Sequence, residues 1–138
     1  MAKPSVLFIC THNSARSQMA EGLLRAKYGD RYEVASAGTE QTHVRPLAIQ
    51  AMSEAGIDIA DHTSTTIDTV TADRSFDVVV TVCDHAREAC PYVPARQQTL
   101  HRSFDDPSAA TGTDEEQLAV FRRVRDEIAR WIDDTFGA

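Results

Sequence analysis

Short, continuous runs of apolar residues mark the strands expected in this chain. The run at residues 5–9 is too continuous for a half-exposed strand, and residues 76–82 form a second strongly apolar run that is rich in valine. Both are typical of strands buried on both faces of a sheet. Residues 32–37 form a third strand that Gly38 ends, and residues 99–101 can form a short fourth.

The segments between these strands show apolar residues at helical spacing. Apolar residues recur at helical spacing over about residues 14–28, and again in a helix whose first turn holds Pro46. A Thr/Ser-rich stretch, residues 62–71, predicts no more than a short helix. Thr113 and Glu116 have the spacing of a capping box, which predicts the start of a long final helix.

The alternation of strands and helices predicts an α/β fold with a parallel sheet of about four strands and helices on both faces. We expect one domain over residues 1–138, because this length supports a single core. In such sheets, ligands bind beyond the carboxyl ends of the strands. Cys10 and Cys83 each follow one of the two most apolar strands directly, so both should emerge at this same edge.

Composition narrows the choice of partners and compartment. The chain has 14 basic and 21 acidic residues, a net charge of −7, which argues against nucleic acid or an anionic membrane surface as a partner. No apolar stretch reaches the roughly 18 residues that a spanning helix needs, and Cys10 and His12 interrupt a run too short for a signal peptide. We therefore expect a cytoplasmic protein. In that compartment, three cysteines favour metal or redox chemistry over a disulfide framework.

A Cys-x5-Arg-Ser pattern follows the first strand and precedes the first helix. A loop of this length can turn several backbone N–H groups and the Arg16 guanidinium toward one point, where the helix N-terminus adds partial positive charge. Asn13 tolerates the positive φ that a tight loop demands. The positive surroundings favour a thiolate at Cys10, to which Ser17 can donate a hydrogen bond. The residues expected to hold a tetrahedral oxyanion are Thr11, His12, Asn13, Ser14, Ala15 and Arg16.

The alternative for this segment is structural: Cys10 would be a small buried apolar residue at a strand end, and Arg16 a surface charge. The charged and polar neighbours of Cys10 favour the chemical interpretation.

The segment from Cys10 to Ser17 resembles the signature loop of the low-molecular-weight tyrosine phosphatases and of the arsenate reductases that share their fold. The resemblance extends over nearly the whole chain, and Ser36-Ala37-Gly38-Thr39 is similar to a stretch that follows the second strand in both groups. Asp105-Asp106-Pro107 resembles the loop that carries the general acid. The resemblance implies that Asp106 is this acid, with Asp105 as the second candidate.

The segment from Val82 to Pro91 resembles the redox segment of thioredoxin-coupled arsenate reductases, which simple phosphatases do not need. If residues 84–89 are helical, the Cα atoms of Cys83 and Cys90 are about 10.5 Å apart along the helix. A disulfide requires about 4.4–6.8 Å. We therefore expect the segment to unwind when these two cysteines form a disulfide.

The resemblance implies an arsenate reductase that uses no metal or organic cofactor. Arsenate would bind in the loop, the Cys10 thiolate would attack arsenic, and Asp106 would protonate the departing oxygen. Cys83 would then attack Cys10, releasing arsenite, and Cys90 would attack Cys83. Thioredoxin or another dithiol reductant would regenerate the thiols.

Three other functions fit parts of the sequence. The first is a tyrosine phosphatase that hydrolyses phosphomonoesters through a phosphocysteine at Cys10, although no aromatic residue stands among the three residues that follow Pro107. The second is a non-enzymatic oxyanion or arsenite sensor. The third is a zinc site, whose ligand spacing matches no common structural pattern. Its ligands would be Cys83, His85 and Cys90, with His101 or His62 as the fourth.

Some proteins that the loop resembles hold a potassium ion near it. Asn13, Glu21 and Ser36 stand at matching positions. Thr65 and Thr66 stand where an acidic ligand would be expected, which argues against potassium in this chain.

Overall fold

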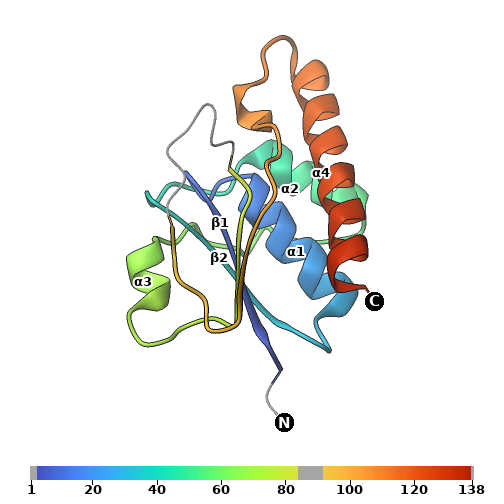
Figure 1. Cartoon of the computed structure of the whole chain (residues 1–138). Helices are drawn as coiled ribbons and strands as arrows, with labels where there is room; N and C mark the ends of the chain where they lie inside the picture. The colour runs from blue at the N-terminus through green and yellow to red at the C-terminus, as the bar shows by residue number, and fades with distance from the viewer. Residues whose placement is uncertain (1–2, 84–91, 138) are drawn as a thin grey trace.

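The computed structural model describes residues 3–83 and 92–137. Within these residues, four parallel strands form one sheet in the order β2-β1-β3-β4 (Figure 1). The strands are β1 (Ser5–Cys10), β2 (Glu33–Gly38), β3 (Val78–Thr81) and β4 (Gln98–His101). The parallel sheet predicted from the sequence is confirmed, with β1 at its centre between β2 and β3.

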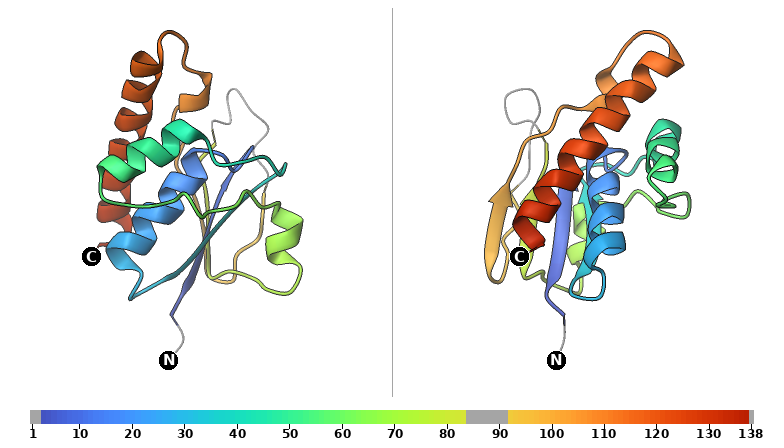
Figure 2. Two further views of the ribbon diagram at one scale, coloured as in Figure 1. Left: turned by 180° about the vertical axis from the view of Figure 1, so that it is seen from behind. Right: turned by 90° about the vertical axis from the view of Figure 1, so that its right-hand side faces the viewer.

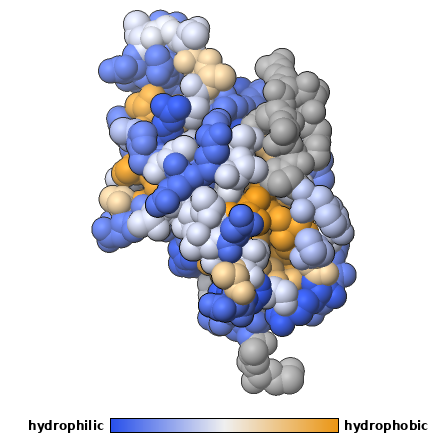
Figure 3. Space-filling model, turned by 90° about the vertical axis from the view of Figure 1, so that its left-hand side faces the viewer, coloured by the Kyte–Doolittle hydropathy of each residue, from blue (hydrophilic) through white to orange (hydrophobic). Residues whose placement is uncertain are grey.

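Helices cover both faces of the sheet, as predicted, but the two layers are unequal (Figure 2). One face carries a five-residue helix, α3 (Ile67–Thr71), and the other carries three longer helices. Seen from the side of α3, apolar surface lies exposed between polar regions (Figure 3). The three helices of the thicker layer are α1 (Arg16–Tyr28), α2 (Pro46–Glu54) and α4 (Asp114–Phe136).

The position of β1 between these layers explains its unbroken apolar sequence. All six of its residues are buried. Because successive side chains of a strand point to opposite faces, Val6 and Phe8 pack with α1 and α4, while Leu7 and Ile9 pack in the smaller layer near α3. Neither face is exposed to water, so no polar alternation appears in the sequence.

The element boundaries differ from the predictions by a few residues. The strand expected over residues 76–82 is shorter in the structure, where β3 pairs with β1 and β4 over Val78–Thr81. Val82 still donates a backbone hydrogen bond of 2.9 Å to Ile9 beyond its end. A 3₁₀ turn at Pro107–Ala109 was not predicted, and Asp106 caps it by accepting a hydrogen bond of 2.9 Å from the Ser108 backbone N–H. The helix expected over residues 84–89 lies outside the described residues.

The final helix begins as its sequence predicts. Thr113 Oγ1 accepts a hydrogen bond from the Glu116 backbone N–H, and the Glu116 carboxylate accepts one from the Thr113 backbone N–H. The apolar stripe of α4 then packs on α1 and α2. None of the described helices combines the length and apolar character needed to cross a membrane.

Truncation of Ile128 tests the packing of α4. Its side chain is fully buried in the larger core, so Ile128→Ala should lower the free energy of unfolding by about 2–5 kcal/mol. Urea denaturation at neutral pH measures this change. Arg130→Ala, an exposed substitution on the same helix, should change it by less than about 0.5 kcal/mol. Equal effects of the two substitutions would contradict the packing of α4 described here.

Candidate active site

The loop between β1 and α1 directs its carbonyl oxygens away from its centre. Four successive carbonyls each accept a hydrogen bond from a group outside the loop. Because a planar trans peptide points its N–H opposite to its C=O, the following N–H groups face the interior of the loop, as in an anion nest. The bonds run from Thr39 N to Thr11 O (2.9 Å), Thr42 Oγ1 to His12 O (2.8 Å), Gln18 Nε2 to Asn13 O (3.1 Å) and Arg45 N to Ser14 O (2.9 Å).

Asn13 is the residue at which the loop turns. It has a φ of 50°, in the left-handed region that asparagine tolerates better than most residues. Its side-chain Oδ1 accepts hydrogen bonds from the Thr65 backbone N–H (2.8 Å) and from Gln18 Nε2 (3.0 Å). A backbone N–H can only donate, so the orientation of the amide is fixed, and Nδ2 donates to Ser17 Oγ (2.8 Å) and Ser36 Oγ (3.0 Å).

Asn13 and Cys10 both contact the Ser17 hydroxyl. Cys10 Sγ and Ser17 Oγ are 2.9 Å apart and both residues are buried. Ser17 Oγ accepts from Asn13 Nδ2, and a Cys10 sulfur without its proton can only accept from the Ser17 O–H. The contact therefore suits Cys10 to act as a nucleophile in its thiolate form.

Arg16 connects the loop to the segment that follows β4. Its side chain is 3% exposed, Nη1 donates to the Phe104 carbonyl (3.3 Å), and Nη2 lies 3.7 Å from Asp106 Oδ2. Asp105 points elsewhere and pairs with Arg123 of α4 at 3.0 Å. Of the two candidate acids, Asp106 is therefore the one whose carboxyl group faces the loop arginine.

Cys83 lies at the same edge of the sheet as Cys10, as the topology predicted. β1 and β3 are neighbours in register, with Ile9 beside Thr81; Cys10 is the last residue of β1, and Cys83 lies two residues beyond β3. Both belong to the same buried apolar cluster. Cys83 is disulfide-bonded, whereas Cys10 is a free thiol and hence not its partner. Cys90 lies outside the described residues.

The zinc site considered from the sequence can be checked only in part. Three of the zinc candidates, Cys83, His62 and His101, are described, and no group of three or more His, Cys, Asp or Glu residues gathers in the described part of the chain. His85, like Cys90, lies outside it.

The three residues matched to a potassium site do lie together. Ser36 donates to Glu21 Oε1 (2.5 Å) and accepts from Asn13. However, the Arg25 guanidinium lies 2.7 Å from Glu21 Oε2, so a cation from the chain itself already contacts this carboxylate. The residues present therefore do not fit potassium.

Sequence reasoning missed Gln18 and Arg25, both on α1. Gln18 is fully buried and supports the loop, but a glutamine in a helix gives no signal of this role. Arg25 stands four residues after Glu21, the spacing of a helical ion pair, which could have been read from the sequence.

Comparison with known proteins shows the family to which this chain is similar. Residues 5–135 match the family of low molecular weight phosphotyrosine protein phosphatases. An arsenate reductase of Halalkalibacterium halodurans is 52% identical over 132 residues, which cover 96% of this chain and 94% of that protein.

Solved structures agree with the sequence relatives. An arsenate reductase in its reduced state superposes with a TM-score of 0.77 at 33% identity, and the match covers 97% of each chain. A thioredoxin-dependent arsenate reductase of Corynebacterium glutamicum superposes with a TM-score of 0.66 at 29% identity, over 96% of this chain and 61% of that one.

A methyl group at Gly38 tests the geometry of the loop. A Cβ there would lie 2.8 Å from Asn13 N and from Thr11 O, which are backbone atoms that cannot move aside independently. Gly38→Ala should therefore displace the loop and weaken phosphate binding by about tenfold or more, as small displacements in preorganised sites do. Isothermal titration with phosphate measures this. Ser53→Ala on α2, an exposed position, should leave the affinity unchanged. Unchanged affinity in Gly38→Ala would show that the loop does not bind the anion.

Proposed function

The chain belongs to the low molecular weight phosphotyrosine protein phosphatase family, and we propose that within it the protein reduces arsenate to arsenite through a relay of three cysteines. Its arsenate reductase relatives support the reaction. The observation that carries the proposal is the position of Cys83: a disulfide-bonded sulfur lies in the same buried cluster as the free Cys10. Hydrolysis of a phosphate ester needs no second sulfur, whereas a two-electron reduction does.

The first step is the attack of Cys10 on arsenic. Arsenate lies in the loop, where the inward N–H groups and Arg16 hold its oxygens. The same groups stabilise the negative charge that builds up during the attack. The thiolate forms a sulfur–arsenic bond while one arsenic–oxygen bond breaks. Asp106 gives its proton to the departing oxygen, which leaves as water.

The second step moves two electrons from sulfur to arsenic. Cys83 attacks the Cys10 sulfur, the sulfur–arsenic bond breaks, and its electron pair remains on arsenic, which leaves as arsenite. A disulfide between Cys10 and Cys83 is left.

The third step carries the disulfide away from the loop. Cys90 attacks Cys83, which frees Cys10 and leaves a disulfide between Cys83 and Cys90. A bonded Cys83 beside a free Cys10 is what this last exchange would produce, and its presence in the structure supports the relay.

We propose that a dithiol protein such as thioredoxin then restores the thiols. The thioredoxin-dependent arsenate reductase of Corynebacterium glutamicum supports this assignment. The reaction would take place in the cytoplasm, where such reductants keep thiols reduced.

A weak phosphatase activity is the second candidate function. The oxyanion loop, the buried Arg16 and the facing Asp106 would serve the transfer of a phosphoryl group to Cys10 equally well. We expect slow hydrolysis of aryl phosphates beside efficient arsenate reduction. Comparing p-nitrophenyl phosphate hydrolysis with thioredoxin-coupled arsenate consumption separates the two functions.

Cysteine variants test the relay through the number of turnovers. Cys10→Ser should release no arsenite. Cys90→Ser should release about one equivalent per enzyme and then stop with thioredoxin as the sole reductant, because the disulfide between Cys10 and Cys83 cannot be passed on. Mass mapping of disulfides after the single turnover should identify that bond. If Cys90→Ser turned over continuously at the normal rate, the relay would be wrong.

Paired variants of the two aspartates test which one is the acid. Asp106→Asn should lower kcat for arsenate reduction by about 10²–10⁴-fold if proton transfer limits the rate, the usual contribution of a general acid. Asp105→Asn loses only a surface pair with Arg123 and should retain kcat within about threefold. Steady-state assays with thioredoxin measure both, and a larger loss in Asp105→Asn would reverse the assignment.

A further inference from the structure

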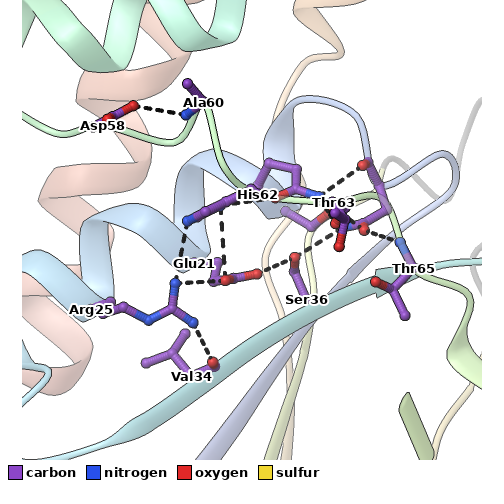
Figure 4. Close-up of polar contacts among 12 residues, drawn as sticks. Glu21, Arg25, Val34, Ser36, Asp58, Ala60, His62, Thr63 and Thr65 are labelled. Atoms are coloured by element: carbon purple, nitrogen blue, oxygen red, sulfur yellow. Dashed lines mark hydrogen bonds and ion pairs between the residues drawn. The ribbon is translucent and has the colours of Figure 1, made fainter. Parts of the chain in front are cut away.

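Glu21 is a mostly buried residue of α1 whose carboxylate contacts the hydrogen-bond network around Asn13. Its side chain is 14% exposed. Figure 4 shows both of its oxygens engaged: Oε1 accepts a hydrogen bond of 2.5 Å from Ser36, and Oε2 lies 2.7 Å from Arg25 Nη1. A carboxylate removed from water needs such compensation, since an unpaired buried charge is strongly destabilising.

The guanidinium of Arg25 is held in place by two further groups. Nη2 donates to the Val34 carbonyl of β2 at 2.6 Å, and Nη1 lies 3.3 Å from His62 Nε2 (Figure 4). Arg25 is about half exposed, but three acceptors on different elements fix its charged end.

Gln18 determines which nitrogen of His62 carries the proton. Gln18 Nε2 faces the carbonyl oxygens of Asn13 and Thr63, so its Oε1 is the end 3.1 Å from His62 Nδ1. In this arrangement Nδ1 donates to Gln18 and Nε2 accepts from Arg25. His62 Nδ1 also lies 3.8 Å from Glu21 Oε2 (Figure 4), farther than the 2.7 Å contact of Arg25. Arg25 is therefore the group that places a permanent positive charge directly against Glu21.

An unbroken chain of contacts joins Arg25 to the nucleophile. The carboxylate of Glu21 accepts from Ser36, whose hydroxyl becomes a better acceptor for Asn13 Nδ2. The other proton of that amide is donated to Ser17, whose hydroxyl contacts the sulfur and would donate to a thiolate there. The amide itself is oriented by the Thr65 backbone N–H. The charge of Glu21 holds the Ser36 O–H toward the carboxylate, which leaves the Ser36 oxygen available to accept from this amide.

From these contacts we infer that Arg25 is a positioning residue, a covalently attached cation that balances the charge of Glu21 and holds the loop network in place. Glu21 contributes one negative charge to this cluster, and Thr65 and Thr66 contribute none. Adding a metal cation beside Arg25 would place two positive charges against one carboxylate. The protein should therefore work without alkali metal ions. This inference deepens the proposed function, and only its turnover assay depends on that function.

The test removes the charge of Arg25 and offers potassium in its place. Reduced Arg25→Gln is assayed at constant ionic strength with either potassium or tetramethylammonium chloride. The first readout is the rate at which iodoacetamide alkylates Cys10, followed by mass spectrometry of its peptide, and its protection by phosphate. The second readout is kcat/KM for arsenate with thioredoxin.

In tetramethylammonium chloride, Arg25→Gln should lose about tenfold in phosphate protection and in kcat/KM, in line with other supporting residues around a reactive centre. Potassium should restore most of both losses, because the vacated place beside Glu21 can then accept a cation. The unaltered protein and Lys27→Gln, whose lysine on α1 pairs with Asp133 instead, should give the same values in both salts. Arg25→Lys should retain most of the phosphate protection in either salt.

Two results would overturn the inference. One is an unaltered protein that potassium activates severalfold. The other is a folded Arg25→Gln, by circular dichroism and thermal melting, whose phosphate protection is either normal or not restored by potassium. The alkylation readout requires no arsenate reduction, so a failure of the proposed reaction would leave this test valid.

Discussion

The side chain of Asn13 is the constraint on which the site depends. One amide bonds to the first turn of α1, to the end of β2 and to the backbone at Thr65. Its backbone meanwhile takes the positive φ that lets the loop close. Asn13 is fully buried, so the loss of any one of these bonds would leave a polar group of its amide unsatisfied. The network therefore favours one arrangement, in which the Cys10 sulfur and the Ser17 hydroxyl are already in contact.

The parallel sheet brings together two cysteines that are distant in the sequence. Cys10 and Cys83 are far apart in the chain but lie at the carboxyl ends of neighbouring strands that run in the same direction. Both belong to the buried cluster of the thicker helical layer. In the proposed relay, the attack of Cys83 on the Cys10–arsenic adduct would be sheltered there from competing hydrolysis of that adduct.

The sequence predicted the parts of this site whose geometry is local. The loop follows from the order of strand, Cys-x5-Arg and helix, and the turn at Asn13 follows from its tolerance of positive φ. The choice between Asp105 and Asp106 could be made only by resemblance, because it depends on how the backbone turns after β4 and on where Arg16 and Arg123 lie. The contacts of Gln18 were equally hidden, since they involve the segment before α3. The pairing of Arg25 with Glu21 could be read from their spacing, but its bond to Val34 of β2 could not.

The segment that carries Asp106 is fastened to the last helix of the chain. Phe104 packs edge-on against Trp131, with ring centroids 6.3 Å apart, and Asp105 pairs with Arg123. The sulfur of Cys10, in contrast, is held by β1 and α1. Partial unwinding at the C-terminus would loosen Asp106, the proposed proton donor, while leaving the Cys10 thiol in place. During ageing or storage, the count of titratable thiols therefore overstates the fraction of molecules still able to complete a turnover.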